Sequence, residues 1–420
     1  MSLTLLFALL GGLLVLAFVA NRLFQWTRLP DVVVLMATGL LIGPVLGWVR
    51  PGPFEGVAHA FGSLALILIL FEAGLDLDLR STLRHFPGGV LLGFLTYALT
   101  TLAVGGIVWR NLGLPLRDAM AVGAIVGCTS STIVLPILQQ WKAREPVRVT
   151  LLVESTLGDI LGVLTTQFLL DFDPAQGSAV TGLASRLALQ IVISLLAALA
   201  IGFLWSKLLP FLSEQRFWQV LTFSMVLLLY AGTEAAKGSG LLAVLGFGLA
   251  LSNLPGARPE MAAMFQWAAP QTTKYEQILS FHSELSFLVR TFFFVMIGVV
   301  VKLRGLRAIW LLLLGVMGAI WLCRWIGVQL TAWSWRECTP ADRKVVLWMV
   351  PRGLITIVLA LAVVEARGDV MSFVPALSFA VVLLTNLLVL IGGIDAARAI
   401  PEPPAADSAP ANASVPPAEA

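Results

Sequence analysis

The chain has 420 residues, of which 58% are hydrophobic and 12% charged, and its mean hydropathy is +0.92. Soluble domains carry about 25% charged residues, so this composition excludes a chain whose main solvent is water. The net charge of +3 is spread thinly over short segments without a basic cluster, which argues against a nucleic-acid-binding protein.

Apolar runs follow one another along the whole chain and predict an all-α polytopic membrane protein. A hydrocarbon core of about 30 Å requires about 20 apolar residues per helix. By this measure the sequence predicts about thirteen transmembrane helices, over residues 3–22, 31–49, 58–75, 87–108, 118–138, 147–170, 187–208, 217–235, 239–254, 284–301, 307–333, 343–364 and 371–395. The first run has no basic start and no small-residue cleavage site, so we expect a retained span rather than a signal peptide.

The Lys and Arg residues between the spans predict the orientation, because such residues favour the cytoplasmic side. Three of the 27 lie within spans, namely Arg290, Arg324 and Arg352. With the N-terminus outside, fifteen of the others fall on the cytoplasmic side and nine on the opposite side. We therefore expect a multi-pass protein of the cell membrane with an external N-terminus and a cytoplasmic C-terminus.

Two segments differ in composition from the spans. Residues 397–420 are rich in Pro, Ala and Ser, which predicts a disordered cytoplasmic tail after a single membrane domain at 1–396. Residues 255–283, between the ninth and tenth spans, include methionines and aromatic residues that suggest a helix lying at the membrane interface.

Four predicted spans contain charged or clustered polar residues, which are costly inside a membrane and usually functional. They are the run Thr129–Thr132 in the fifth span, Glu154, Ser155 and Asp159 in the sixth, Arg324 in the eleventh and Arg352 in the twelfth. At a rise of about 1.5 Å per residue, Asp159, Thr129 and Arg352 all lie near the middle of the membrane. Glu154 and Arg324 lie somewhat towards the cytoplasmic side at matching depth, where they can pair.

The two acids of the sixth span are expected to have different roles. Ser155 and Asp159 are four residues apart and share a helix face, whereas Glu154 points about 140° away from Asp159. Glu154 is therefore expected to neutralise Arg324. Asp159 has no sequence-local cation and is free to face a cavity, where an unpaired carboxylate can exchange a proton for a cation.

The fifth and twelfth spans are each interrupted at mid-depth, one by Gly127 and the polar run, the other by Pro351 and Gly353. Proline removes a backbone donor, and glycine loosens a helix. Breaks at corresponding depths in the two halves of a transporter predict an inverted repeat with two discontinuous helices at a binding site. Arg352 is then expected to compensate the dipoles of the broken helices.

Hydroxyl side chains also have purely structural uses in membrane helices, because they bond back to the helix or join neighbouring helices. That structural role is the better interpretation for Ser131 and Thr132. For Thr129 and Ser130, the structural and the ion-binding interpretations are equally supported, since both lie at the depth of Asp159.

Three further charged residues are interpreted without a role in the ion site. Arg290 lies near the cytoplasmic end of the tenth span, where snorkelling to the membrane surface accounts for its charge. Glu72 and Glu234 fall at span ends and are interpreted as interfacial acids.

Several sequence motifs occur in these spans in an order that characterises one family. They are RLPDVVVLMATGLLIGP ending at Pro44, LFEAGLDLDLR around Glu72, VESTLGD at 153–159, GTEAAKGSGLLAV around Glu234, FFFVMIG at 292–298 and PRG at 351–353. VESTLGD resembles the E-S-x-x-N-D motif of monovalent cation/proton antiporters of the NhaP and NHE branch. The resemblance covers nearly the whole membrane portion.

The resemblance implies a fold of thirteen helices with two crossed broken helices in a core domain. It also implies a dimerisation domain, interleaved with the core within 1–396, and hence a homodimer. By the same resemblance Asp159 corresponds to the carrier aspartate, and Thr129 and Ser155 to ion-site hydroxyls. The structural acid–base pair and the arginine of the second broken helix correspond to Glu154, Arg324 and Arg352.

Two positions depart from the NhaP and NHE pattern. Gly158 occupies the place of the Asn or Asp that precedes the carrier aspartate. Thr129, Ser130 and Ser131 stand where that branch has T-D-P, and they are more similar to the S-S-T of the potassium-efflux branch. The choice between Na⁺, Li⁺ and K⁺ therefore stays open.

The sequence thus predicts a secondary transporter that exchanges a monovalent cation for protons by alternating access within the lipid bilayer. A single carrier acid, Asp159, predicts electroneutral exchange. A cation channel or ligand-gated potassium-efflux pore on the same fold is the alternative. An enzyme is not predicted, because no nucleophile, histidine base or metal cluster shares the depth of Asp159. The three cysteines are far apart, and no cofactor or resident metal is implied.

Overall fold

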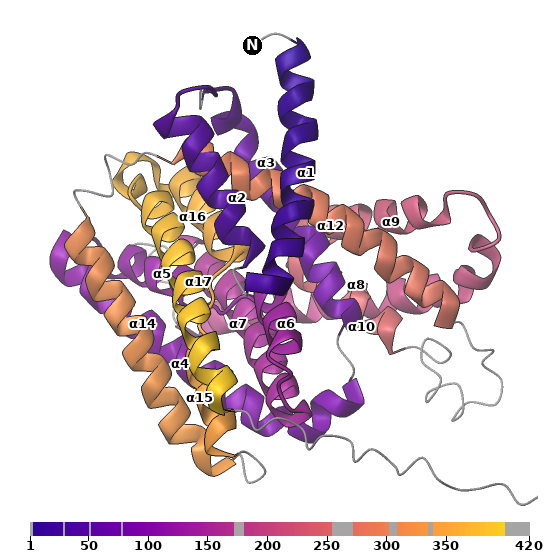
Figure 1. The fold of residues 1–420 in the computed structure, drawn as a ribbon. Helices are drawn as coiled ribbons and strands as arrows, with labels where there is room; N and C mark the ends of the chain where they lie inside the picture. Colours follow the sequence, from indigo (N-terminus) through magenta and orange to yellow (C-terminus); the bar gives the residue numbers. More distant parts are fainter. Residues whose placement is uncertain are drawn as a thin grey trace, which may run out of the picture.

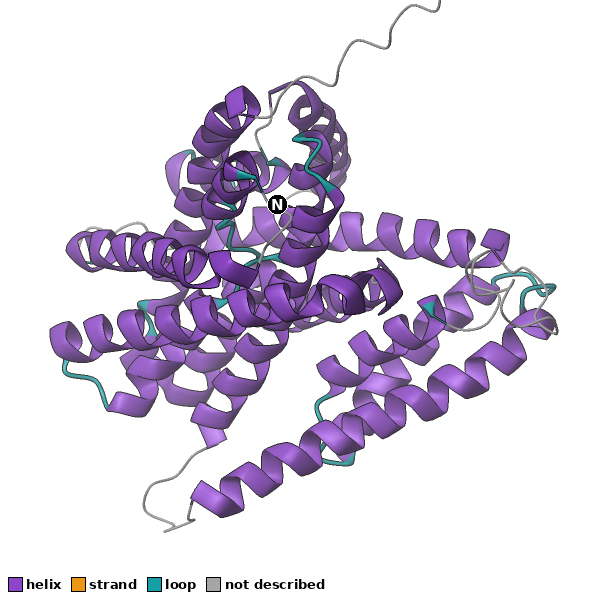
Figure 2. Cartoon of the chain, turned by 90° about the horizontal axis from the view of Figure 1, so that it is seen from below, coloured by secondary structure: helices purple, strands orange, loops and turns teal. Residues whose placement is uncertain are grey.

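The computed structural model describes residues 3–27, 30–49, 52–76, 79–171, 180–253, 272–301, 309–334 and 339–399. Within these ranges the regular elements are helices, which confirms the all-α prediction (Figures 1 and 2). The helices are α1 (Leu3–Thr27), α2 (Asp31–Leu40), α3 (Gly52–Asp76), α4 (Leu79–Leu112), α5 (Leu116–Gly127), α6 (Ser131–Gln140), α7 (Glu145–Asp171), α8 (Val180–Leu212), α9 (Trp218–Ala235), α10 (Gly240–Ser252), α12 (Thr272–Val300), α14 (Trp310–Thr331), α15 (Pro340–Trp348), α16 (Leu354–Arg367) and α17 (Val374–Ala399).

Each predicted span overlaps at least one of these helices, and two of the spans overlap a pair of shorter helices. The pairs are α5 with α6 and α15 with α16, which occupy the predicted spans 118–138 and 343–364. Among the described residues, six segments are long and apolar enough to cross a membrane: Pro87–Leu112, Leu116–Gln140, Ala188–Leu212, Glu276–Val300, Trp310–Thr331 and Val374–Gly393. These segments are those of a multi-pass membrane protein.

One predicted boundary is wrong by about three helical turns. α12 begins at Thr272, so residues 272–283 belong to the helix of the tenth span and not to a separate interfacial helix. The predicted span began too late because the first turns of α12 contain polar residues such as Glu276 and Ser283, which line a polar cavity. Residues 255–271 of the expected interfacial segment lie outside the described residues, as do residues 400–420 of the expected tail.

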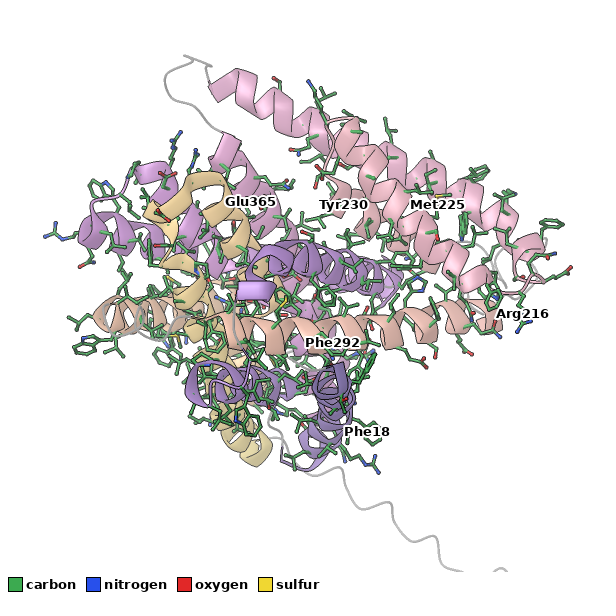
Figure 3. All side chains as sticks on the ribbon, turned by 90° about the horizontal axis from the view of Figure 1, so that it is seen from above. Phe18, Arg216, Met225, Tyr230, Phe292 and Glu365 are labelled. Atoms are coloured by element: carbon green, nitrogen blue, oxygen red, sulfur yellow. The ribbon has the colours of Figure 1, made fainter. Side chains whose placement is uncertain are left out.

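The helices pack in two groups. The broken-helix group consists of α4, α5, α6, α7, α14, α15, α16 and α17, and the peripheral group of α1, α2, α3, α8, α9, α10 and α12. The groups meet where α3 packs against α16 and α6, and where α2 packs against α17. Figure 3 places Met225 of α9 and Arg216 on one side of the molecule and Glu365 of α16 on the other.

Close helix packing in the peripheral group depends on glycines at the crossing points. A Cβ atom at Gly74 of α3 would overlap the carbonyl oxygen of Leu245, and one at Gly248 of α10 would overlap that of Phe71. Small residues let membrane helices approach closely where the hydrophobic effect offers little driving force. This reciprocal contact fixes α3, which carries one wall of the cavity described below.

Candidate ion-binding site

The first broken helix is interrupted over three residues. α5 ends at Gly127, Cys128 is extended with ψ 136°, and α6 begins at Ser131. Such an interruption leaves the last carbonyls of α5 and the first amides of α6 without partners in their own helices. These backbone groups are therefore available to side chains or ions.

The second broken helix crosses the first at this interruption. α15 ends at Trp348, and α16 begins at Leu354. Between them, the carbonyl of Pro351 accepts a hydrogen bond of 2.9 Å from the amide of Ser130. A Cβ atom at Gly353 would overlap the side chain of Ser130, so glycine is what allows the two backbones to approach. The prediction of two crossed discontinuous helices is confirmed.

Each of the two buried arginines binds the carboxyl end of a half-helix. Arg352 donates from Nε to the carbonyl of Val126 in the last turn of α5, at 2.7 Å. Arg324 donates to the carbonyl of Val346 in the last turn of α15, at 3.0 and 2.8 Å. Carboxyl ends of helices carry partial negative charge, so both guanidinium groups are stabilised there. This geometry supports the expectation that Arg352 compensates a helix dipole.

A hydrogen-bonded network joins the two arginines through Glu154 and Thr129. Arg324 forms an ion pair with Glu154, as the sequence predicts. The hydroxyl of Thr129 donates to Glu154 at 3.3 Å and accepts from Arg352 at 2.9 Å. All four residues are at most 5% exposed. Buried charges are tolerated when they are paired and hydrogen-bonded, and this network meets that condition except at Oε2 of Glu154, which has no hydrogen-bond partner among the described residues.

Asp159 lies outside this network. Its side chain is 2% exposed, and one carboxylate oxygen accepts a hydrogen bond of 2.8 Å from the hydroxyl of Ser131. The other oxygen, Oδ1, has no hydrogen-bond partner in the described part of the chain. Since Ser131 is the first residue of α6, Asp159 faces the positive end of that half-helix. A buried carboxylate with one bare oxygen can take up a proton or a cation.

The hydroxyl groups around Asp159 are arranged differently from the sequence-based expectation. Ser131, for which a structural role was favoured, makes the direct contact with the carboxylate. Ser155, expected at the ion site, donates instead to the carbonyl of Leu152 at 3.1 Å. Ser130 contacts the hydroxyl of Thr132 at 3.0 Å. Ser131 is thus one residue whose contact with Asp159 sequence reasoning missed.

Gly158 faces the interruption of the first broken helix. A Cβ atom there would lie 3.4 Å from the amide nitrogen of Thr129 and 3.7 Å from Cα of Cys128, both ordinary contact distances. The position where the antiporter motif has Asn or Asp is therefore directed at the crossing, with room for a side chain to begin.

A polar cavity reaches Ser131, the residue whose hydroxyl donates to Asp159. This inner cavity has a volume of about 180 Å³ and is lined by Ser131 and Thr132, by Glu72 and Asp76 of α3, and by Ser283 and Arg290 of α12, among others. A space of only about 10 Å³ lies against Asp159 elsewhere, lined mostly by apolar residues such as Leu70 and Leu245. Asp159 thus lies against a small apolar space, and its hydrogen-bond partner Ser131 lines the polar inner cavity.

A second, outer cavity of about 570 Å³ adjoins the first. The two cavities share three lining residues, Glu72, Ser283 and Arg290, which we call the neck. The outer cavity also has Glu276 and Glu284 in its wall. Glu72 and Arg290, interpreted from sequence as interfacial and snorkelling residues, thus line the approach to Asp159. Sequence reasoning missed them because cavity lining depends on how helices pack.

Comparison with known proteins identifies the family. Residues 13–396 match the family described as "Sodium/hydrogen exchanger, transmembrane". The chain belongs to the sodium/hydrogen exchanger family. The resemblance to monovalent cation/proton antiporters of the NhaP branch is confirmed. Members of this family are transporters and not enzymes, in agreement with the sequence-based expectation.

Two curated relatives illustrate the family's range of cations. The chain is 27% identical to "Na(+)/H(+) antiporter 1" of Methanocaldococcus jannaschii over 342 residues, covering 79% of this chain and 76% of that protein. It is also 27% identical to "K(+)/H(+) antiporter NhaP2" of Shewanella sp. strain MR-4 over 399 residues, covering 91% of this chain. The chain spans 65% of the length of that Shewanella protein.

The fold of this exchanger matches a solved structure. The sodium proton antiporter MjNhaP1 from M. jannaschii at pH 8 aligns with a TM-score of 0.74, covering 95% of this chain and 97% of the other. The sequence identity in this alignment is 24%, so the match establishes the shared fold. No group of three or more His, Cys, Asp or Glu residues that could hold a metal ion occurs in the part of the chain that the structure describes.

Proposed function

We propose that this exchanger transports Na⁺, Li⁺ or K⁺ in exchange for protons by alternating access at Asp159. The single observation that carries the proposal is the state of this carboxylate. It is buried, it has one oxygen without a hydrogen-bond partner among the described residues, and the Ser131 hydroxyl that it contacts belongs to a residue lining a polar cavity. A cation and a proton compete for the same oxygen, so uptake of one requires release of the other.

Hydroxyl groups of the first broken helix and of α7 complete the proposed site. Ser131 already contacts Asp159 and supplies the first hydroxyl oxygen. Ser155 lies one helical turn before Asp159, and rotation away from the Leu152 carbonyl would turn its hydroxyl to a bound cation. Thr129 and Ser130 act through the crossing itself, because their polar groups hold the two broken helices together.

The network of Glu154, Arg324 and Arg352 is proposed to hold the site without carrying ions. Its arginines bind Glu154 and two helix ends, and the positive charge of Arg324 beside Glu154 opposes the binding of a cation at that carboxylate. With Asp159 as the one carrier acid, each turnover moves one positive charge in each direction. We therefore expect electroneutral exchange.

Movement of the broken-helix group relative to the peripheral group would expose Asp159 alternately to the two sides. The inner cavity lies between these groups, since α3 and α12 form one wall and α6 and α7 the other. With the N-terminus outside, this cavity faces the cytoplasm. The family resemblance also implies a homodimer. We propose that the peripheral groups of the two subunits contact each other in it.

Proton flux in proteoliposomes tests the proposal. The purified exchanger should acidify or alkalinise the lumen when a gradient of Na⁺, Li⁺ or K⁺ is applied, and Asp159→Asn should abolish this response. The exposed Glu145→Gln serves as a matched carboxylate-to-amide control and should retain it. Cation-dependent proton flux in Asp159→Asn would disprove the carrier assignment.

A channel is not favoured by any of these observations. The family and the relatives' names point to antiporters. Cation flux without counterflow of protons in the same vesicles would instead support a channel.

A further inference from the structure

The neck between the two cavities carries one basic and one acidic side chain. Arg290 of α12 and Glu72 of α3 each line both the inner and the outer cavity. The hydroxyl of Ser283, the third neck residue, donates to Glu72 at 2.7 Å. A cation that moves from the outer cavity towards Asp159 passes these groups, so the charge at the neck affects how readily it arrives.

Arg290, the basic residue of the neck, forms an ion pair with Asp31, which lines neither cavity. Arg290 donates to Asp31 at 3.2 Å, and the two side chains are 20% and 16% exposed. Asp31 is itself fixed, because its other carboxylate oxygen accepts the amide of Val32 at 2.9 Å in the first turn of α2. The Nε of Arg290 has no hydrogen-bond partner within the described ranges. The arginine is therefore restrained at one end of its guanidinium group.

Helix packing does not require this ion pair. α2 and α12 are already in backbone contact, since a Cβ atom at Gly39 would overlap the carbonyl of Val295 and one at Gly298 would lie 2.6 Å from the carbonyl of Met36. An arginine inside a membrane protein is costly, and a role other than packing is the usual reason for its presence.

We infer that the Asp31–Arg290 pair tunes cation entry, with Asp31 offsetting a positive charge that Arg290 places at the neck. This inference rests on the proposed exchange function. Arg290 opposes the passage of a cation, and Asp31 weakens that opposition by pairing with it. The pair thus sets the apparent affinity for the transported cation without touching the ion at Asp159.

The inference predicts opposite effects for the two members of one ion pair. Arg290→Gln leaves the negative charge of Asp31 beside the neck and should lower the KM for the cation. Asp31→Asn leaves Arg290 uncompensated and should raise it. Each change should be about two- to fivefold, as expected for partly exposed charge pairs. The double variant removes both charges and should return the KM close to that of the wild type.

The experiment measures the initial rate of Na⁺- and K⁺-driven proton flux in proteoliposomes at fixed pH, for the wild type, both single variants and the double variant. Glu145→Gln and Arg148→Gln are the matched controls, because this exposed pair lines neither cavity. Their KM values should equal that of the wild type. Raising the ionic strength with an impermeant salt should reduce the difference between the two single variants, since screening weakens partly exposed charges.

A purely structural pair would give a different pattern. Both single variants would then lose maximal rate or thermal stability together, with KM unchanged or shifted in the same direction, and this result would overturn the inference. Failure of the inference is distinguishable from failure of the proposed function. In the first case the wild type exchanges cations for protons and Asp159→Asn does not, whereas in the second the wild type itself shows no exchange.

Discussion

Asp118, in the first turn of α5, accepts a hydrogen bond of 3.1 Å from Arg367, the last residue of α16. An equivalent pair lies at the other ends of the same broken helices. There, Arg144 after α6 donates to Asp342 in the first turn of α15, at 2.8 Å. Each pair joins the start of one broken helix to the end of the other. The two ion pairs are arranged as an inverted repeat would require, and they hold the crossed helices as one unit.

These pairs should contribute unequally to stability. Asp118 is 6% exposed, and its partner Arg367 also binds the carbonyl of Leu170 at 2.8 Å. We expect Asp118→Asn to lower the free energy of unfolding by about 1–3 kcal/mol, since both side chains of this pair are largely shielded from water, at 21% and 9% exposed. Arg144 has a side chain that is 52% exposed, so Arg144→Gln should cost at most about 1 kcal/mol.

Thermal unfolding in detergent measures both changes. Glu145→Gln, which breaks a pair with both partners exposed, should leave the unfolding temperature within error of the wild type. A larger loss for Arg144→Gln than for Asp118→Asn would show that burial does not set the strength of these pairs.

Gly353 should be intolerant of even a methyl group. A Cβ atom at this position would overlap Ser130 at the crossing of the broken helices, so Gly353→Ala should separate the two interruptions and cost about 1–3 kcal/mol. Gly318→Ala on α14 is the matched control, because nothing lies within 4 Å of its Cβ position. It should be neutral or slightly stabilising.

A compensating change tests the contact itself. Ser130→Gly removes the atoms that the new methyl group meets, so the double variant Ser130→Gly/Gly353→Ala should recover part of the lost unfolding temperature. Equal destabilisation of Gly353→Ala with and without Ser130→Gly would contradict the proposed contact.

Sequence reasoning located the residues of the crossing for a physical reason. A charge in the middle of a membrane requires a partner at the same depth, and counting residues gives depth. Counting depth in this way predicted the pairing of Glu154 with Arg324. It also predicted that Thr129 and Arg352 lie at the depth of Asp159. The breaks followed from glycine and proline positions.

The contacts of Asp159 could not be predicted in the same way. Helix periodicity relates Ser155 to Asp159 only within α7, and it says nothing about a residue on another helix. Ser131 follows three non-helical residues, so the angle of 100° per residue does not carry through from α5. Its direction is fixed by the backbone of the interruption and by the packing of α6 on α7. Helix periodicity in the sequence predicts neither the backbone of the interruption nor the packing of α6 on α7.

The roles of these two hydroxyls can be separated by measurement. Ser131→Ala removes a hydrogen bond to a buried carboxylate, and we expect the KM for the cation to rise about tenfold. Ser155→Ala removes a bond to a backbone carbonyl and should have a smaller effect. Initial rates of cation-driven proton flux give both values. A larger effect at Ser155 would assign the first hydroxyl ligand to Ser155 and leave Ser131 a structural contact.

Gly158→Asp tests the proposed stoichiometry, because it adds a second acid next to Asp159 at a position with room for a side chain. The new Cβ atom would lie 3.4 Å from the amide nitrogen of Thr129, where an amide can stabilise a carboxylate. Proton flux should be insensitive to an imposed membrane potential in the wild type and in the uncharged isostere Gly158→Asn. In Gly158→Asp it should respond to the potential, since two acids bind more protons than one cation replaces. If the wild type already responds, exchange at Asp159 alone is not electroneutral, and the proposal of a single carrier acid is wrong.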